Sequence, residues 1–338
     1  MKTLAYGFPK LGEKREFKSL LENFWKGKIS EADFIDGMNS LRDWMAELYS
    51  SHVDLFPSGE LSYYDFVLDT AITLGAVPKR FGDYRGLETY FQMARGGQAL
   101  EMTKYFNTNY HYLVPELESK SFRLLKNIPL EEFSHFKNRG YSPLPKLVAP
   151  FTFLKLSKVL KKSSTSQLPL YELSKLESQK DFEEYLNAVF PVYEELLKSL
   201  KGAGAQAVLM EDPALCLEME GWEWELVHET YGCLSKHLDV YVLTYYDSLS
   251  DYRRFVDLPV KALGLEIFPE VPAESLTVIK APSELNTAEF IKFLTSNEPL
   301  EIVNVTAPVL DKIKLFPNLN SVPLNDSVAV VVFLNSKS

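Results

Sequence analysis

Cysteine is scarce in this sequence, with Cys216 and Cys233 as the two thiols among 338 residues. Two cysteines cannot build the disulfide framework of a small secreted fold, and they are too few for a cysteine-rich zinc site. A reducing, cytoplasmic setting is therefore expected. The sequence contains neither a His-x-Cys nor a Gly-x-Ser-x-Gly pattern, so zinc catalysis and a serine-elbow hydrolase have no local signature.

Positive charge and long apolar runs are also in short supply. The 36 Lys and Arg residues face 46 Asp and Glu residues, which gives a net charge of −10. Such a field repels phosphate and anionic lipid, so we expect no nucleic-acid partner and no membrane, although a small basic site is compatible with it. Runs such as 328–334 are far shorter than the roughly 20 residues that cross a bilayer. The N-terminus becomes charged before a signal-peptide core forms.

Short apolar segments alternate with longer helical patterns along the chain. Phe17, Leu20, Leu21 and Phe24 have the spacing of one buried helix face, and a second helical pattern runs over 186–200. Pro191 predicts a kink or a break in that second helix, and Gly202 and Gly204 supply its end. The predicted strands are 4–8, 53–56, 109–114, 146–153, 207–211, 240–245, 262–268, 275–279, 301–305 and 328–334.

Strands that alternate with helices predict parallel βαβ units of the α/β class. A closed barrel and an open doubly wound sheet both fit, and the strand count favours a metal-free (βα)8 TIM-type barrel. No Gly-rich phosphate loop supports a dinucleotide-binding sheet. Because ten strands are predicted and such a barrel has eight, about two of the ten should be hairpins or extensions. We expect the barrel over residues 1–310, with 311–338 as a divergent C-terminal extension packed on it.

A basic cluster opens the first predicted helix, directly after the first predicted strand. Its members are Lys10, Lys14, Arg15 and Lys18. Cations at a helix start oppose the helix dipole, which hints at a local anionic ligand. Spacing alone nevertheless favours a solvated, charged helix face with acidic neighbours, because charge runs usually lie on surfaces.

Three other stretches carry polar groups. Ser62 with Asp65 resembles a capping box that starts a helix. Lys104 is a second candidate anion contact, whereas His111 between two tyrosines is expected to be a hydrogen-bonded core residue. The adjacent Glu211 and Asp212 should point to opposite sides of an extended segment. A carboxylate pair of the glycosidase kind would therefore need a partner for Glu211 such as Asp247 or Glu266.

Longer stretches resemble cobalamin-independent methionine synthase. The resemblance begins with GFPKLGEKREFKSLLENFWKGK at 7–28 and continues in the family's order across about three quarters of the chain. The last seventy or so residues match poorly. The other matching stretches are SYYDFVLDTAITLGAVPKRFG (62–82), YFQMARGGQALEMTKYFNTNYHYLVPE (90–116), APFTFLKLSK (149–158), EDPAL (211–215) and TYYDSLSDY (244–252).

That family has two barrels in one chain, and the resemblance covers the N-terminal one. It implies that the zinc ligands and the homocysteine site belong to the other barrel, so that this chain binds no cofactor and contains no catalytic residue. It also implies that this barrel helps to hold the polyglutamate tail of a methyl-folate. By resemblance, the family's tail-binding stretches correspond to Arg15, Glu16, Phe17, Lys18 and Lys104. For Arg15, Lys18 and Lys104 the resemblance therefore favours ligand contacts over a solvated surface. A string of carboxylates needs such cations.

We therefore predict the accessory, folate-tail-binding half of a split methionine synthase, inactive alone. Its partners would be a separate zinc-bearing catalytic barrel and a methyl-folate or related acidic-tailed pterin. Two rivals remain: a binding or regulatory module that kept the fold but lost the methyltransferase role, and an independent barrel enzyme using Glu211, Asp247 or Glu266. The chain being a piece cut from a longer synthase is a further alternative.

Overall fold

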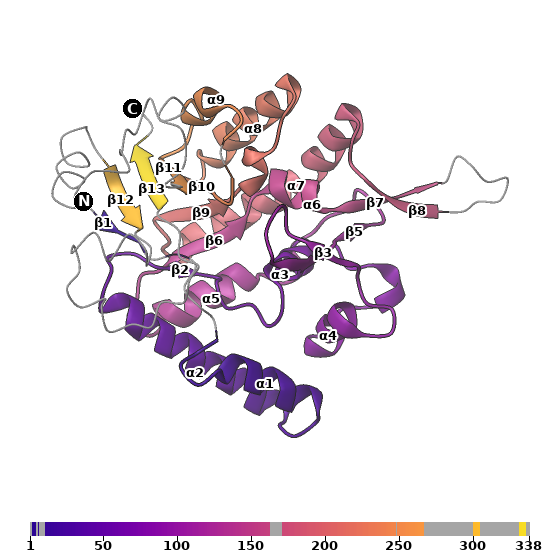
Figure 1. Cartoon of the computed structure of the whole chain (residues 1–338), viewed down its shortest axis with the longest axis vertical. Coiled ribbons are helices and arrows are strands. Elements are labelled where there is room, and N and C mark those ends of the chain that lie inside the picture. The colour runs from indigo at the N-terminus through magenta and orange to yellow at the C-terminus, as the bar shows by residue number, and fades with distance from the viewer. Residues whose placement is uncertain are drawn as a thin grey trace.

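A computed structural model describes residues 2–4, 6, 11–162, 171–247, 249–266, 300–304 and 331–335. Lys10, the predicted strand 275–279 and the predicted domain boundary at 310–311 lie outside these ranges. Strands and helices are interspersed along the described chain, which Figure 1 colours from indigo at the N-terminus to yellow at the C-terminus.

The helices are α1 (Glu16–Trp25), α2 (Glu31–Ser50), α3 (Phe66–Thr73), α4 (Leu87–Arg95), α5 (Ile128–Lys137), α6 (Pro150–Leu156), α7 (Gln179–Gly202), α8 (Gly221–Leu234) and α9 (Tyr252–Val256), with short 3-10 turns at Lys79–Phe81 and Pro213–Cys216. The strands are β1 (Lys2–Thr3), β2 (Pro57–Ser58), β3 (Met102–Lys104), β4 (His111–Leu113), β5 (Glu116–Leu117), β6 (Leu144–Val148), β7 (Lys158–Lys162), β8 (Tyr171–Lys175), β9 (Ala207–Glu211), β10 (Asp239–Thr244), β11 (Ala262–Glu266), β12 (Leu300–Asn304) and β13 (Val331–Asn335).

One sheet organises the molecule, with the strand order β1-β12-β13-β11-β10-β9-β6-β2. All of its pairings are parallel except those of β13, which runs antiparallel to both β11 and β12. This confirms an α/β fold built on a parallel sheet. An isolated parallel bridge joins Leu4, just after β1, to Leu55, just before β2. The two ends of the sheet are therefore neighbours at that point.

Several predicted strands belong elsewhere. The predicted strand 109–114 shortens to β4, which pairs with β3 in an antiparallel hairpin outside the main sheet. The predicted run 146–153 is wrong in its second half, because Pro150 occupies the first turn of α6, where its missing N–H costs no hydrogen bond. β5, β7 and β8 form a small separate sheet. More strands are expected than a barrel has places for, and some strands indeed form hairpins or small sheets outside the main sheet.

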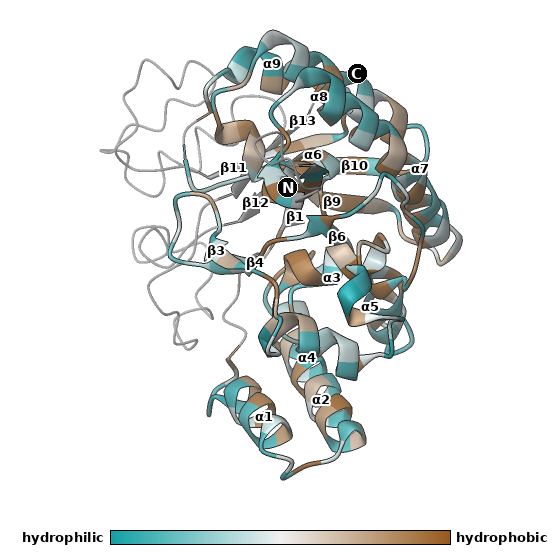
Figure 2. Cartoon of the chain, turned by 90° about the vertical axis from the view of Figure 1, so that its right-hand side faces the viewer, coloured by the Kyte–Doolittle hydropathy of each residue, from teal (hydrophilic) through white to brown (hydrophobic). Residues whose placement is uncertain are grey.

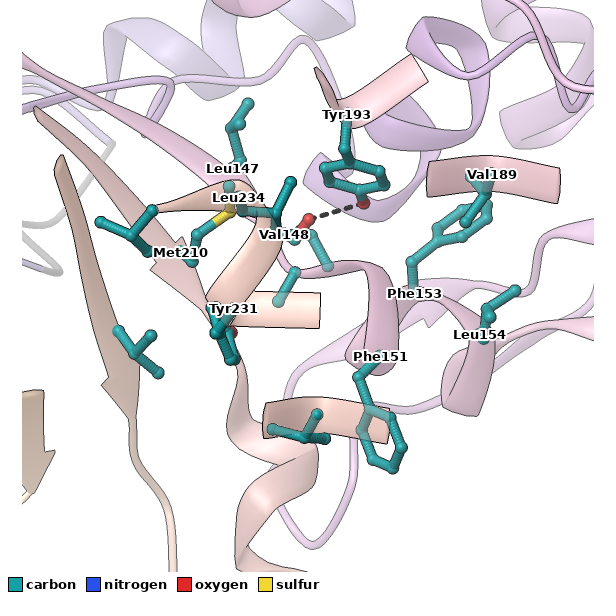
Figure 3. Close-up of a cluster of buried hydrophobic side chains, with 14 of the residues drawn as sticks. Leu147, Val148, Phe151, Phe153, Leu154, Val189, Tyr193, Met210, Tyr231 and Leu234 are labelled. Carbon is teal, nitrogen blue, oxygen red and sulfur yellow. Dashed lines mark hydrogen bonds between the residues drawn. The ribbon is translucent and has the colours of Figure 1, made fainter. Parts of the chain in front are cut away.

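Helix α7 supplies much of the core. Its buried side chains include Val189, Tyr193 and Leu200, which confirms the predicted face. The predicted break at Pro191 is wrong, since α7 continues through it and ends at Gly202. Tyr193 donates its hydroxyl to the carbonyl oxygen of Val148 at 2.7 Å, which ties α7 to β6 (Figure 3). The packing along α7 offsets the hydrogen bond that Pro191 cannot make.

Helices α1 and α2 lie side by side at one end of the molecule (Figures 1 and 2). In α1, Leu21 is buried, and Phe17, Leu20 and Phe24 pack against the same cluster, as their spacing predicts. α2 begins with a capping box between Ser30 and Asp33. The tail-binding prediction thus falls on a helix whose apolar face is fixed against α2.

Candidate functional site

The end of β9 carries a buried ionisable pair. Glu211 is the last residue of β9, and Lys146 lies in the neighbouring strand β6. The Lys146 Nζ lies 3.1 Å from the Glu211 Oε2, and their side chains are 7% and 2% exposed. The hydroxyls of Tyr6 and Tyr245 both donate to Oε1, the latter at 3.3 Å. Two neighbouring strands and two tyrosines that follow β1 and β10 in the chain thus converge on one carboxyl group.

Burial raises the pKa of Glu211 to about 8 from an ordinary 4.5, and the hydrogen bond from Tyr245 opposes that shift. The folded chain therefore holds this proton more tightly than the unfolded chain does. Its contribution to stability is fully present below about pH 4.5 and is lost as the pH rises through about 8.

We expect Glu211→Gln to flatten this pH dependence. Because glutamine cannot ionise, the stability of the variant should not fall as the pH rises through about 8, whereas that of the parent chain should. Urea denaturation between pH 5 and 9 measures this difference. Glu229→Gln, at an exposed position of α8, is the control and should leave the profile unchanged. Parallel profiles for parent and Glu211→Gln would contradict the prediction.

Asp212 faces the other way. Thr152 of α6 donates its hydroxyl to Oδ1 at 2.5 Å, and Tyr231 of α8 donates to Oδ2 at 2.7 Å. Burial raises the pKa of this carboxyl to about 6. The prediction that Glu211 and Asp212 point to opposite sides is confirmed. Asp212 ties two helices to β9 and so has a structural role.

A carboxylate-based enzyme would need Asp247 or Glu266 as the partner of Glu211. The backbone carbonyl of Asp247 lies 3.2 Å from the Cys216 sulfur, and the side chain of Glu266 is outside the description. Lys146 occupies the position beside Glu211 instead. A lysine within the apolar run LPKLV was the sequence signal for this pair, but its partner lies 65 residues away and no spacing rule connects the two.

The predicted tail-binding residues near α1 lie at the surface. Arg15 is the residue before α1, is exposed, and has a left-handed φ of 64°. Lys18 is exposed and lies 3.7 Å from Glu22. The Glu16 carboxylate accepts the backbone N–H of Lys14 at 2.9 Å, while Phe17 packs against the core. Arg15 is thus available to solvent, and Lys18 is only loosely paired.

Lys104 lies on a different element, at the end of β3, where it is exposed and pairs in register with His111 of β4. Figure 2 places the β3–β4 hairpin beside the sheet and α1 beside α2. The prediction that His111 is a core residue is wrong, since it is exposed and its Nδ1 lies 3.1 Å from the Asn109 carbonyl oxygen.

Zinc finds no suitable ligand set in the described ranges. No three His, Cys, Asp or Glu side chains gather there closely enough to hold a metal ion. The Cys216 sulfur lies 2.9 Å from the Thr244 hydroxyl, and Cys233 is on α8.

No helix among the described residues is both long and apolar enough to cross a membrane.

Comparison with known proteins adds a family to this geometry. A family model described as the N-terminal domain of cobalamin-independent synthase matches residues 2–285. The 5-methyltetrahydropteroyltriglutamate–homocysteine methyltransferase of Thermotoga maritima is 51% identical over 266 residues, which cover 79% of this chain and 34% of that protein. The protein of the same name from Thermodesulfovibrio yellowstonii is 40% identical over 276 residues, covering 79% and 35%.

Among solved structures, a B12-independent methionine synthase from a Shewanella species superimposes with a TM-score of 0.44 at 14% identity, covering 65% of this chain and 54% of that one. The chain spans about a third of the length of the curated relatives that it matches.

Proposed function

The chain belongs to the cobalamin-independent methionine synthase family through that family's N-terminal domain, and from this premise we propose that it is the accessory, folate-tail-binding half of a split synthase. In this proposal Arg15, Lys18 and Lys104 bind the carboxylates of a polyglutamate tail. A separate barrel binds zinc, which makes homocysteine a thiolate for methyl transfer. In this proposal the eight-stranded main sheet, with β13 antiparallel, closes into a barrel, and the bridge between Leu4 and Leu55 supports that closure.

The exposure of Arg15 is the observation that carries this proposal. A left-handed φ is costly for a residue with a β-carbon, and here it is adopted by a cation at the start of a helix. That position sets a guanidinium beside the first turn of α1, where the Phe17 N–H already donates to the Leu11 carbonyl oxygen at 3.2 Å. Carboxylates are the ligands that a guanidinium prefers. Lys18 is three residues further along the chain, in the first turn of α1.

We expect this chain to increase the rate of methyl transfer when it is mixed with a zinc-bearing catalytic barrel, homocysteine and triglutamylated methyltetrahydrofolate. Arg15→Ala and Lys104→Ala should each raise the KM for this donor roughly 5- to 100-fold, because each removes a charge-assisted hydrogen bond. Steady-state rates at varied donor concentration provide the measurement, with titration calorimetry of the chain alone as the direct test of binding.

Two controls sharpen this experiment. Lys28→Ala removes an exposed lysine beyond the end of α1 and should behave like the parent chain. A monoglutamylated donor should bind more weakly and should show little difference between variants. An unchanged rate on mixing would refute the accessory role, and equal binding of the two donors would refute the tail site.

A further inference from the structure

A cavity lies beside β6, between α3, α5 and α7. Its walls include Phe66 and Thr73 of α3, Ile128 and Glu132 of α5, Lys146 of β6 and Leu196 of α7. We call it the α3–α5 cavity. A second, more polar pocket at the surface is lined by Tyr84, Lys126, Glu131 and His135. Both are lined by Asp69, Ile128 and Glu132, so the cavity and the second pocket adjoin each other.

On the walls, the buried Thr73 Oγ1 and Glu211 Oε2 receive no hydrogen bond from the described residues, although the Lys146 Nζ lies 3.1 Å from the latter, and the Glu132 carboxylate has one oxygen to which no described group donates. Thr73 is 2% exposed, and its Oγ1 has no partner there. Glu132 is 7% exposed. Arg42 donates to its Oε1 from Nε at 3.1 Å and from Nη2 at 2.7 Å, and no described donor reaches Oε2. A β-carbon built on Gly59, another wall residue, would lie 4.0 Å from that Oε2. A buried polar atom without a partner, such as the Thr73 Oγ1, is costly.

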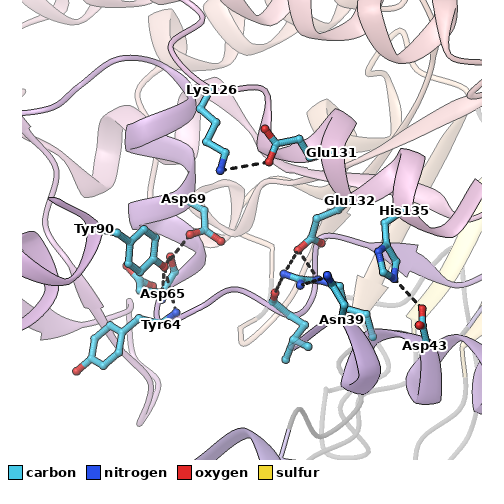
Figure 4. Close-up of polar contacts among 12 residues, drawn as sticks. Asn39, Asp43, Tyr64, Asp65, Asp69, Tyr90, Lys126, Glu131, Glu132 and His135 are labelled. Carbon is cyan, nitrogen blue, oxygen red and sulfur yellow. Dashed lines mark hydrogen bonds and ion pairs between the residues drawn. The ribbon is translucent and has the colours of Figure 1, made fainter. Parts of the chain in front are cut away.

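The cations around the α3–α5 cavity already have carboxylate neighbours. Lys146 lies beside Glu211, and Arg42 lies beside Glu132 at Oε1. In the adjoining second pocket, Lys126 lies 3.3 Å from Glu131. His135 lies 2.7 Å from the Asp43 carboxylate, and Asp69 accepts the hydroxyl of Tyr90 (Figure 4). The polar groups of the walls that remain available to a ligand are therefore hydrogen-bond acceptors, and they lie beside the apolar side chains of Phe66, Ile128 and Leu196.

We propose that the α3–α5 cavity binds a small aliphatic amine. Its protonated amino group donates to the Glu132 Oε2 and the Thr73 Oγ1, and its hydrocarbon part lies against Phe66, Ile128 and Leu196. An ammonium ion has three N–H donors, enough for both of these acceptors. Its hydrogen bond to a carboxylate is strengthened by the opposite charges. This site is separate from the predicted tail contacts on α1 and β3, and it does not depend on the function proposed for them.

The test uses n-butylammonium chloride as the probe, titrated into the whole chain in excess sodium chloride and followed by ligand-observed NMR. Butylammonium should bind saturably and more tightly than the neutral isostere 1-butanol, and butanoate should not bind. Thr73→Val should weaken butylammonium binding roughly 3- to 10-fold, as expected for one lost hydrogen bond. Without ligand the Tm of this variant should not fall, because the lost hydroxyl has no partner among the described residues.

Thr230→Val is the matched control, since Thr230 is a buried threonine of α8 that does not line the α3–α5 cavity. It should leave butylammonium binding unchanged. Absence of saturable binding, or equal binding of butylammonium and butanol, would show that the cavity holds only water and overturn the proposal. So would an affinity that Thr73→Val leaves intact.

Discussion

Replacing Arg42 with methionine should lower the free energy of unfolding by about 3–5 kcal/mol, the cost of leaving one member of a buried ion pair alone. The side chains of Arg42 and Glu132 are 7% and 9% exposed, and the closest approach of their charged groups is 2.7 Å. Arg42 also donates to the carbonyl oxygen of Leu61 at 3.1 Å and to Asn39 at 3.2 Å. Methionine would fill much of the volume but leave the Glu132 charge without a counter-ion. Urea denaturation followed by circular dichroism measures the loss.

The double variant Arg42→Met with Glu132→Leu separates the two causes. It removes the stranded charge as well, so it should recover most of the lost stability. Lys126→Met breaks the partly exposed pair with Glu131 and should cost no more than about 1 kcal/mol. If Arg42→Met proves as mild as Lys126→Met, the buried pair does not hold α2 to α5.

Asp65→Ala should be the second large loss, about 2–5 kcal/mol, because one carboxylate serves three donors. Its Oδ2 caps α3 by accepting the N–H of Leu68 at 3.0 Å and also accepts the N–H of Leu113 in β4 at 3.1 Å. Its Oδ1 accepts the Tyr110 hydroxyl at 2.7 Å. Burial raises the pKa of Asp65, and these three bonds oppose that shift. Alanine would strand two backbone donors in the interior. Thermal unfolding and urea denaturation give the size of the loss.

Ser30→Ala is the comparison for this variant. It removes an exposed cap of α2 and should cost about 1 kcal/mol. Amide hydrogen exchange adds a local readout, since the N–H of Leu113 should exchange faster in Asp65→Ala than in the parent chain. Protection that stays unchanged would mean that Asp65 does not fix the hairpin that carries Lys104.

Local patterns predicted the parts of this fold that depend on neighbours in the chain. The apolar runs of β9, β10 and β11 gave parallel strands, and helical spacing gave the buried faces of α1 and α7. The alternation of side chains in an extended segment separated Glu211 from Asp212. Each of these inferences needs only residues a few positions apart.

Features that depend on distant partners were missed. The sequence places a capping box at Ser62, but α3 begins after Asp65, whose carboxylate serves β4 as well as the helix. The segment 109–114 has residues that suit any strand, so the sequence does not show which strand it pairs with. Its pairing with β3 is set by the turn between β3 and β4. Lys146 pairs with Glu211 only because β6 and β9 are adjacent.

The position of β13 has a consequence for how the polypeptide reaches this state on the ribosome. β13 follows β12 in the chain yet lies between β11 and β12, so neither neighbour has its final partner until residue 335 has been synthesised. Until then both offer unpaired backbone groups along one side, a feature that invites association with other nascent chains. Such late, long-range pairing slows folding. Expression of this protein should therefore respond to chaperone supply more than its size alone would suggest.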